Sequence, residues 1–150
     1  MLAIRDFVPA DAAAVSALIR TTMRESNTRD YALALLQPLM DYFTPEKVLL
    51  LSRERICLVA EVDRQVIGTA ALDGAEVCTF FVLPAHQGAG VGTQLLAALE
   101  QRARRCGLTR LTVDASVTGA GFYARRGFRR TGVERDGTAG TQIGMVKDLL

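Results

Sequence analysis

A glycine-rich segment that follows an apolar run carries the clearest chemical signal in this sequence. Residues 79–83 read T-F-F-V-L, which is typical of a buried strand that ends at Pro84. Gly88, Gly90 and Gly92 come next, and apolar residues then recur at helical spacing from about Gly90. Glycines let backbone N–H groups approach a ligand closely, and a helix N-terminus favours negative charge. The segment therefore predicts a phosphate-binding turn.

Two common phosphate-binding motifs do not fit these letters. A P-loop requires Gly-Lys-Ser/Thr, whereas Gly92 is followed by Thr93 and Gln94. A dinucleotide fingerprint, G-x-G-x-x-G, would need a third glycine at position 93, and its acidic ribose ligand has only Asp114 as a loose match. The pattern that does fit is Q-x-x-G-x-G, residues 87–92, directly after the strand.

Length, composition and charge narrow the class of protein. The chain has 150 residues, of which 49% are hydrophobic, and a formal net charge of +2. These values are typical of one packed domain, residues 1–150, and the charge is too small to indicate nucleic-acid binding. No run approaches the roughly 18 apolar residues of a membrane span, and Cys57, Cys78 and Cys106 lack metal-ligand spacing. We therefore expect a cytoplasmic protein with reduced thiols, no membrane partner and no metal.

The apolar pattern also predicts the elements that position the turn. Strands are expected at residues 2–7, 56–62, 66–72, 76–83, 110–114, 128–135 and 142–147. Helices are expected at 12–20, 30–40, 45–53 and 119–126, and from about Gly90 to a cap at Gly107. Turns at 63–65 and 73–74 make the strands before the glycine-rich segment antiparallel, and a further turn is expected at 136–137. Because a helix separates strand 76–83 from strand 110–114, those two should run parallel. The prediction is an α/β (α+β) fold with one mixed, mostly antiparallel sheet.

A second segment, residues 114–128, reads D-A-S-V-T-G-A-G-F-Y-A-R-R-G-F. Together with the glycine-rich turn it resembles the GNAT superfamily of N-acyltransferases, in which this segment is D-A-S-x-N-A-x-x-F-Y-x-x-x-G-F. The Phe-Tyr pair at 122–123 and the Gly-Phe pair at 127–128 match. Thr118 and Gly119 stand where asparagine and alanine are usual.

The resemblance implies how a cofactor, acetyl-CoA, is held. It is specific from about residue 76 to residue 128, and it implies a single domain whose two parallel strands splay apart between flanking helices. The pantetheine arm would run between these strands, and the diphosphate would lie on the turn. The cofactor-binding residues that the resemblance implies are Phe80, Phe81, Val82, Gln87, Gly88, Ala89, Gly90, Val91, Gly92, Thr93, Ser116, Gly119 and Phe122.

Attack of an amine on an acyl thioester needs a base, a donor for the oxyanion and an acid for the leaving thiolate. A phenol of pKa about 10 can protonate a thiolate of pKa about 8.5, and Tyr123 fits this role. The alternative is that Tyr123 only packs with Phe122 and Phe128. Since adjacent helix residues do not share a face, we expect Phe122 in the core and Tyr123 toward the sulfur. A backbone N–H near Val82 is the expected oxyanion donor.

The general base is open between several carboxylates. The resemblance places a glutamate eleven residues before Gln87, and this position is Glu76. The other interpretation of Glu76 is a solvated carboxylate at the edge of its strand. Asp73 or Asp114 would then take the proton.

The resemblance thus implies an N-acetyltransferase that passes the acetyl group of acetyl-CoA directly to an amine, without a covalent intermediate. The acceptor, a small-molecule or peptide amine, would lie against the helices of residues 21–53, where polar candidates are Ser26, Asn27, Asp30, Tyr31 and Tyr42. The alternative from another class is a non-catalytic acyl-CoA-binding sensor or partner module. Exposed sheet edges make a homodimer a further expectation.

Overall fold

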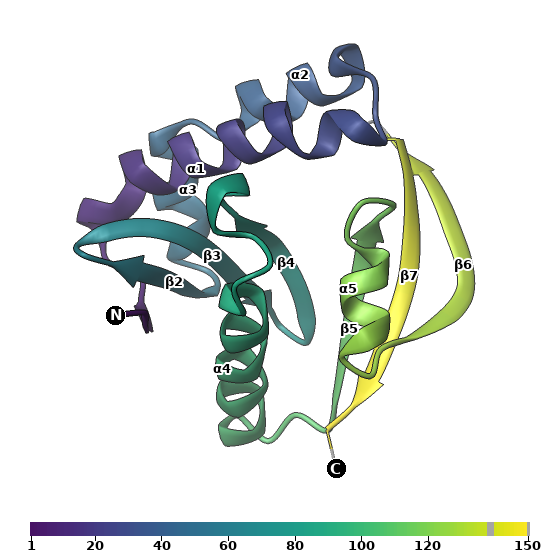
Figure 1. Cartoon of the computed structure of the whole chain (residues 1–150). Helices are drawn as coiled ribbons and strands as arrows, with labels where there is room; N and C mark the ends of the chain where they lie inside the picture. Colours follow the sequence, from purple (N-terminus) through teal and green to yellow (C-terminus); the bar gives the residue numbers. More distant parts are fainter. Residues whose placement is uncertain (138–139, 150) are drawn as a thin grey trace.

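A seven-stranded sheet that divides into two halves forms the centre of the protein (Figure 1). The computed structural model describes residues 1–137 and 140–149, and all statements here concern those residues. The strand order is β1-β2-β3-β4-β5-β7-β6; the β4–β5 pair is parallel and its neighbours are antiparallel. The strands are β1 (Ala3–Asp6), β2 (Ile56–Val62), β3 (Gln65–Asp73), β4 (Glu76–Val82), β5 (Arg110–Ser116), β6 (Arg129–Gly137) and β7 (Gly140–Asp148).

The helices cover both faces of the sheet and one end of the gap between its halves. They are α1 (Ala12–Glu25), α2 (Leu33–Tyr42), α3 (Pro45–Ser52), α4 (Val91–Arg105) and α5 (Ala120–Arg125), with the short turns η1 (Pro9–Asp11), η2 (Asn27–Arg29) and η3 (Pro84–His86). In Figure 1, α4 lies beside β2–β4 and α5 beside β5–β7, while α1 and α2 pass over the top. This arrangement leaves the ends of β4 and β5 facing each other beneath α1.

Alternating side chains on the strands explain why helices pack on both faces. On β2, Leu58 and Ala60 join the cluster beneath α4, whereas Val59 between them joins the cluster beneath α1–α3. Successive strand residues point to opposite faces, so one apolar strand supports two cores. The α4 cluster includes the buried side chains of Leu95, Leu96 and Leu99, and the α1 cluster those of Val15, Ile19, Leu36 and Met40.

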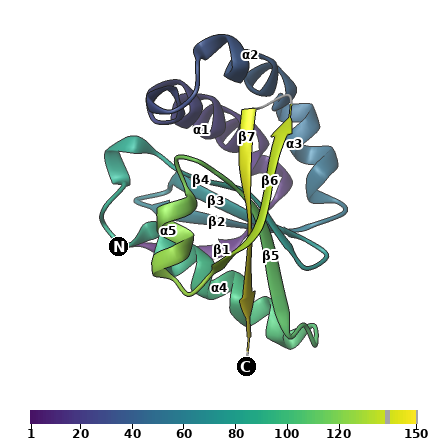
Figure 2. The same cartoon turned by 90° about the vertical axis from the view of Figure 1, so that its right-hand side faces the viewer.

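The separation of β4 from β5 begins at a bulge. The two strands pair at Glu76 with Thr112 and at Val77 with Val113. Further along, Thr79 has a φ of +49°, and the register between β3 and β4 shifts there. A bulge bends its strand and increases the local twist, so β4 turns away from β5. Figure 2 shows the result, with β5–β7 crossing the direction of β1–β4.

The predicted α/β fold with a mixed sheet and one parallel pair is confirmed, with local differences. The first helix extends to Glu25 instead of ending near residue 20, because Thr22 and Met23 continue its buried face one turn after Leu18 and Ile19. The second begins at Leu33 rather than 30, after the η2 turn. The predicted turn at 136–137 instead lies within β6, and the connection falls on 138–139, outside the described residues.

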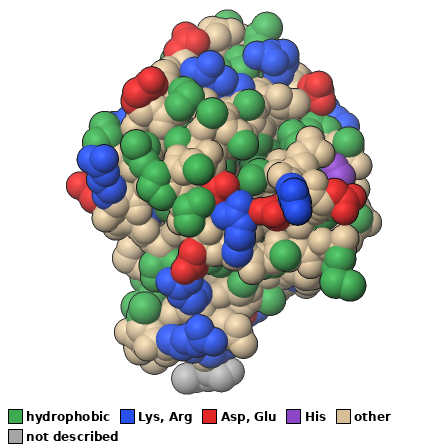
Figure 3. Space-filling model, turned by 90° about the vertical axis from the view of Figure 1, so that its left-hand side faces the viewer, with side chains coloured by type: hydrophobic (Ala, Val, Ile, Leu, Met, Phe, Trp, Pro, Cys, Tyr) green, Lys and Arg blue, Asp and Glu red, His purple; other side chains and the backbone are tan. Residues whose placement is uncertain are grey.

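Charges of both signs are mixed on the surface. Figure 3 shows Lys and Arg side chains interspersed with Asp and Glu on the face at the left of Figure 1, with hydrophobic side chains among them. Within residues 1–137 and 140–149, no helix is long and apolar enough to cross a membrane. No group of three His, Cys, Asp or Glu side chains in the same residues is placed to hold a metal ion.

Candidate active site

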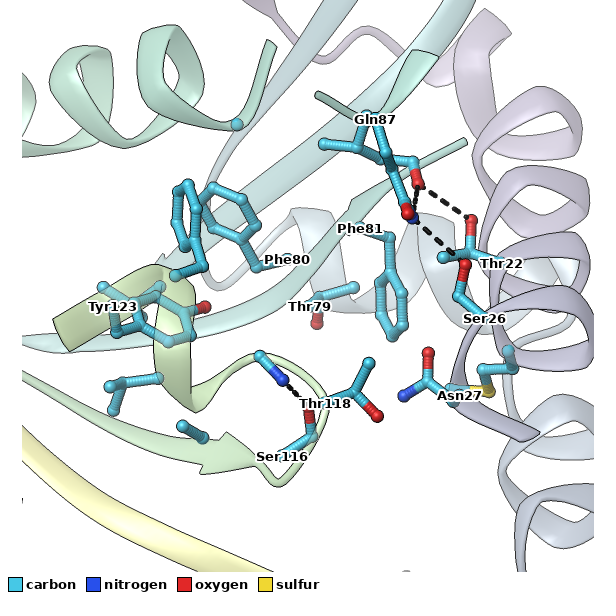
Figure 4. Close-up of a pocket in the computed structure, with 18 of the residues that line it drawn as sticks. Thr22, Ser26, Asn27, Thr79, Phe80, Phe81, Gln87, Ser116, Thr118 and Tyr123 are labelled. Atoms are coloured by element: carbon cyan, nitrogen blue, oxygen red, sulfur yellow. Dashed lines mark hydrogen bonds between the residues drawn. The ribbon is translucent and has the colours of Figure 1, made fainter. Parts of the chain in front are cut away.

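A cavity of about 600 Å³ occupies the space where β4 and β5 separate. Its walls come from these two strands, from the turn before α4, from α5, and from α1, η2 and α2. Figure 4 shows Phe80 and Tyr123 on one side of it and Thr22, Ser26 and Asn27 on the other. A volume of this size is typical of ligand-binding pockets. The cavity thus connects the glycine-rich turn with the N-terminal helices.

The glycine-rich turn presents backbone amides at the N-terminus of α4. Gly88 has a φ of +79°, and Gly90, the N-cap of α4, has a φ of +86°. An added Cβ would meet no atom within 4 Å at either position, so the left-handed backbone, not crowding, is what favours glycine there. At Gly92 the reason differs, because a Cβ would lie 3.1 Å from Cε1 of Phe122. The N-terminus of this helix, with its dipole, suits an anion.

Gln87 ties the turn to α1 and β4. Its Nε2 donates to the carbonyl oxygen of Val82 at 2.9 Å and to Oγ of Ser26 at 3.1 Å (Figure 4). Oγ1 of Thr22 lies 3.5 Å from the same Val82 oxygen. The side-chain amide nitrogen of Gln87 therefore donates to two acceptors within the protein. Gln87 contributes to a ligand site by holding the turn in position.

Tyr123 is packed among aromatic rings with its hydroxyl at the cavity. The ring centroids of Phe80, Phe122 and Phe128 lie 5.8, 5.3 and 5.3 Å from that of Tyr123, in edge-to-face arrangements. In Figure 4 the hydroxyl points toward Thr79, across the cavity. It makes no hydrogen bond to another described residue, and burial raises the pKa of the phenol well above its usual value. The group is a neutral proton donor aimed at the cavity.

The family model of the acetyltransferase (GNAT) domain matches residues 33–149. The chain belongs to the GNAT acetyltransferase family. The amino-acid acetyltransferase of Azotobacter vinelandii is similar, with 33% identity over 129 residues that cover 75% of this chain and 28% of that protein. The corresponding protein of Pseudomonas putida strain GB-1 is 32% identical over the same shares. The chain spans 28% of the length of these curated relatives.

Solved structures of GNAT proteins share the fold. A GCN5-related N-acetyltransferase from Rhodopseudomonas palustris has a TM-score of 0.90 and 26% identity, covering 97% of this chain and 94% of that one. The PaiA N-acetyltransferase from Thermoplasma acidophilum, solved with coenzyme A, has a TM-score of 0.86 and 18% identity over 99% of both chains. The predicted resemblance to the GNAT superfamily is thus confirmed.

In this GNAT domain the cavity brings most of the predicted site residues together. Every predicted cofactor-binding residue lines it except Ala89, which lies in the turn but not on the cavity wall. Ser116 lines the wall and also accepts a hydrogen bond from the amide of Gly119, 2.9 Å away, before α5. Phe122 is half-buried and Tyr123 buried, the reverse of the expected order. Tyr123 is buried because its ring packs against Phe80 of β4 and against Phe128. A prediction from helix faces alone does not include these contacts.

Glu76 is not brought to the cavity. It is exposed at the start of β4, where it pairs with Asp73 across the hairpin, and it is absent from the cavity wall. Among the described lining residues the one carboxylate is that of Asp114, which the sequence offered as a substitute. The position of Glu76 therefore does not support its predicted role as the base.

Only some of the polar residues predicted for the acceptor side line the cavity. Ser26, Asn27 and Tyr31 line the cavity, whereas Asp30 and Tyr42 do not. Sequence reasoning missed two polar lining residues of this side, Thr22 and Arg29, and it also missed Gln142 of β7. A short polar stretch before a helix is a weak signal, and nothing in the sequence places Gln142 opposite it.

The thiol nearest the site is not an activated nucleophile. Cys78 lines the cavity, and burial raises the pKa of its thiol. The thiolate is the reactive form of cysteine, so this environment disfavours attack by Cys78 on a thioester. Cys57, Cys78 and Cys106 are all free.

Proposed function

We propose that this GNAT domain transfers the acetyl group of acetyl-CoA directly to the amine of a small molecule or peptide. The observation that carries the proposal is the continuity of one cavity from the N-terminus of α4, past the hydroxyl of Tyr123, to α1 and α2. A cofactor with an anionic end and a reactive thioester matches the first part. The second part leaves room for an amine.

The cofactor would be held mainly by backbone groups. Its diphosphate would accept hydrogen bonds from amides of the turn and of the first residues of α4, where Gly88 and Gly90 keep the backbone uncovered. Beyond Val77, β4 has no pairing with β5, so backbone groups on that edge need other partners. The amides of the pantetheine arm supply such partners along Phe80 and Val82. The carbonyl of Val82 already accepts from Gln87, which leaves its N–H as the oxyanion donor on this edge.

Tyr123 would act as the general acid. The amine nitrogen attacks the thioester carbon, the carbon–sulfur bond then breaks, and the leaving thiolate takes the proton of the phenol. Because burial keeps the phenol protonated, the acid is in its active form throughout the neutral range. The edge-to-face rings of Phe80, Phe122 and Phe128 fix the direction of the hydroxyl.

The proton lost by the amine needs an acceptor. We assign this role to Asp114 in place of Glu76, since Asp114 lines the cavity and Glu76 lies outside it. A bound water on the hydroxyl of Ser116, which faces the same cavity, can connect the amine with the carboxylate. A cytoplasmic location and pairing into a homodimer stay predictions.

A screen for thiol release from acetyl-CoA tests the proposal. Free coenzyme A is measured after addition of single amines, with amino acids included first because of the names of the curated relatives. Release that depends on one class of amine, with the acetylated amine found by mass spectrometry, supports transfer. Tight binding of acetyl-CoA with slow release that no amine accelerates would instead identify a non-catalytic acyl-CoA-binding module.

A further inference from the structure

The acceptor end of the cavity has few charged groups. The wall formed by α1, η2 and α2 consists mainly of hydroxyl, amide and apolar side chains, such as Thr22, Ser26, Asn27 and Leu36. Arg29 is the cation that this wall contributes. The two other arginines of the cavity, Arg125 and Arg126, come from α5. The wall of α1, η2 and α2 therefore contributes one arginine to the cavity, and α5 contributes two.

Hydrogen bonds hold the η2 turn, which carries Arg29, in one position. The amide of Arg29 donates to the carbonyl of Ser26 at 3.2 Å, and that of Tyr31 to the carbonyl of Asn27 at 2.9 Å. The hydroxyl of Tyr31 then accepts from the amide of Val117 at 2.7 Å, on the opposite side of the cavity. The backbone of η2 is thus held across the acceptor end, with Arg29 at its rim.

The guanidinium of Arg29 has no fixed partner among the described residues. It makes no hydrogen bond or ion pair with another residue of the described part of the chain. Arg126 differs, because its Nε and its terminal nitrogen donate to Oγ1 of Thr93 at 3.0 and 2.6 Å. Arg29 therefore presents its full set of donors to whatever enters this end of the cavity.

These charges discriminate between classes of amine. A polyamine or an aminoglycoside brings several ammonium groups, and each one that leaves water needs an acceptor or a carboxylate. The described wall of the cavity supplies one carboxylate, that of Asp114, while Arg29 repels further cations. A carboxylate on the acceptor would form two parallel hydrogen bonds with the guanidinium, the geometry that arginine favours.

We infer that the acceptor is an amine that also bears a carboxylate, and that Arg29 binds this carboxylate. The inference rests on the proposed transferase function. Arg29 determines specificity for the acceptor and takes no part in the chemical step.

Matched acceptors test the substrate class. The probes are L-leucine, L-glutamate and L-lysine, each against its own α-amide, with spermidine as the polyamine, and thiol release is measured with saturating acetyl-CoA. We expect kcat/KM for the best amino acid to exceed that for its amide at least tenfold, although the α-amine of the amide is the less basic. Equal or better turnover of the amides or of spermidine overturns the inference but leaves acetyl transfer intact. The absence of turnover with every amine of the wider screen contradicts the transferase function itself.

Substitution of Arg29 tests the residue. In Arg29→Gln we expect KM for the best amino acid to rise about tenfold, KM for acetyl-CoA to stay unchanged, and turnover of the matching amide to stay unchanged. Arg29→Lys should recover part of the loss. Arg24→Gln is the control, because Arg24 is exposed on α1 and does not line the cavity. An equal effect of Arg29→Gln on acid and amide, or no effect on either, contradicts the assignment.

Discussion

The hydroxyl of Tyr31 lies 2.7 Å from the backbone nitrogen of Val117, a residue 86 positions further along the chain. The same hydroxyl donates to the carbonyl of Thr141 at 2.7 Å. A Cβ on Gly140 would lie 2.9 Å from the Tyr31 ring, so glycine allows the ring to pack against the start of β7. One side chain thus joins the start of α2 to the far ends of β5 and β7, across the acceptor end of the cavity.

Removal of this hydroxyl should affect the acceptor and not the cofactor. Tyr31→Phe keeps the ring but removes the hydroxyl that contacts the Val117 amide and the Thr141 carbonyl, at a cost of about 1–3 kcal/mol in the free energy of unfolding. We expect KM for the acceptor to rise about fivefold, which corresponds to roughly 1 kcal/mol, and KM for acetyl-CoA to stay unchanged. Tyr42→Phe, on the exposed side of α2, is the control. Equal increases in both KM values would contradict a local role.

Tyr123→Phe should separate chemistry from folding. The ring contacts with Phe80, Phe122 and Phe128 remain, and the hydroxyl has no hydrogen bond to a described residue, so the unfolding temperature should change little. Loss of the general acid should lower kcat about 10²-fold or more, with no change in acetyl-CoA affinity. Steady-state kinetics and thermal unfolding check both parts. A fully active variant removes Tyr123 from the mechanism.

The pH dependence of turnover follows from the same phenol. Its pKa is raised by burial, so it stays protonated through pH 10, the value of an ordinary tyrosine. The rate should rise with pH as the amine of the acceptor loses its proton, and it should not fall again below pH 10. Initial rates between pH 6 and pH 10 measure this. A decrease above pH 8 that disappears in Tyr123→Phe would show that the phenol ionises too early for the proposed role.

Two carboxylates compete for the role of proton acceptor. Asp114→Asn should lower kcat/KM about 10²-fold near pH 7, and less at high pH, where the amine is already neutral. Glu76→Gln should leave kcat/KM within about twofold, because the side chain is exposed outside the cavity. Both variants are measured over the same pH range. The opposite outcome, with Glu76→Gln inactive and Asp114→Asn active, would restore the assignment made from the sequence.

The fold could be predicted from the sequence because its elements are local and well marked. Apolar runs give the strands, and β2 has the predicted bounds Ile56–Val62. β4 ends at Val82, two residues before Pro84, and Thr44 caps the start of α3 by accepting from the amide of Lys47 at 3.1 Å. Such signals depend on a few neighbouring residues, so they survive without knowledge of the tertiary structure.

Which of the predicted residues line the cavity could be predicted where backbone geometry decides it, and not where distance through space decides it. The glycines of the turn are visible in the sequence because left-handed backbone favours them. Thr79 adopts a left-handed φ that threonine rarely takes, so the bulge that opens the cavity has no sequence signal. Glu76 was selected by counting along the chain, but the separation of β4 from β5 decides which residues reach the cavity.

The central claim is that amides of the glycine-rich turn and the start of α4 hold the diphosphate of coenzyme A. Gly90→Val and Gly74→Val form a matched pair, since both glycines have a left-handed φ, +86° and +61°, and neither has an atom within 4 Å of an added Cβ. Each should lose a similar amount of stability, about 1–2 kcal/mol, but Gly74 lies in the β3–β4 hairpin, away from the cavity wall.

Calorimetric titration with coenzyme A measures the affinity of each variant for the cofactor. We predict measurable binding to the unaltered protein and to Gly74→Val. We predict no binding to Gly90→Val at a temperature at which its thermal unfolding curve shows that it is folded. Binding of equal affinity to both variants would contradict the claim that this turn holds the cofactor.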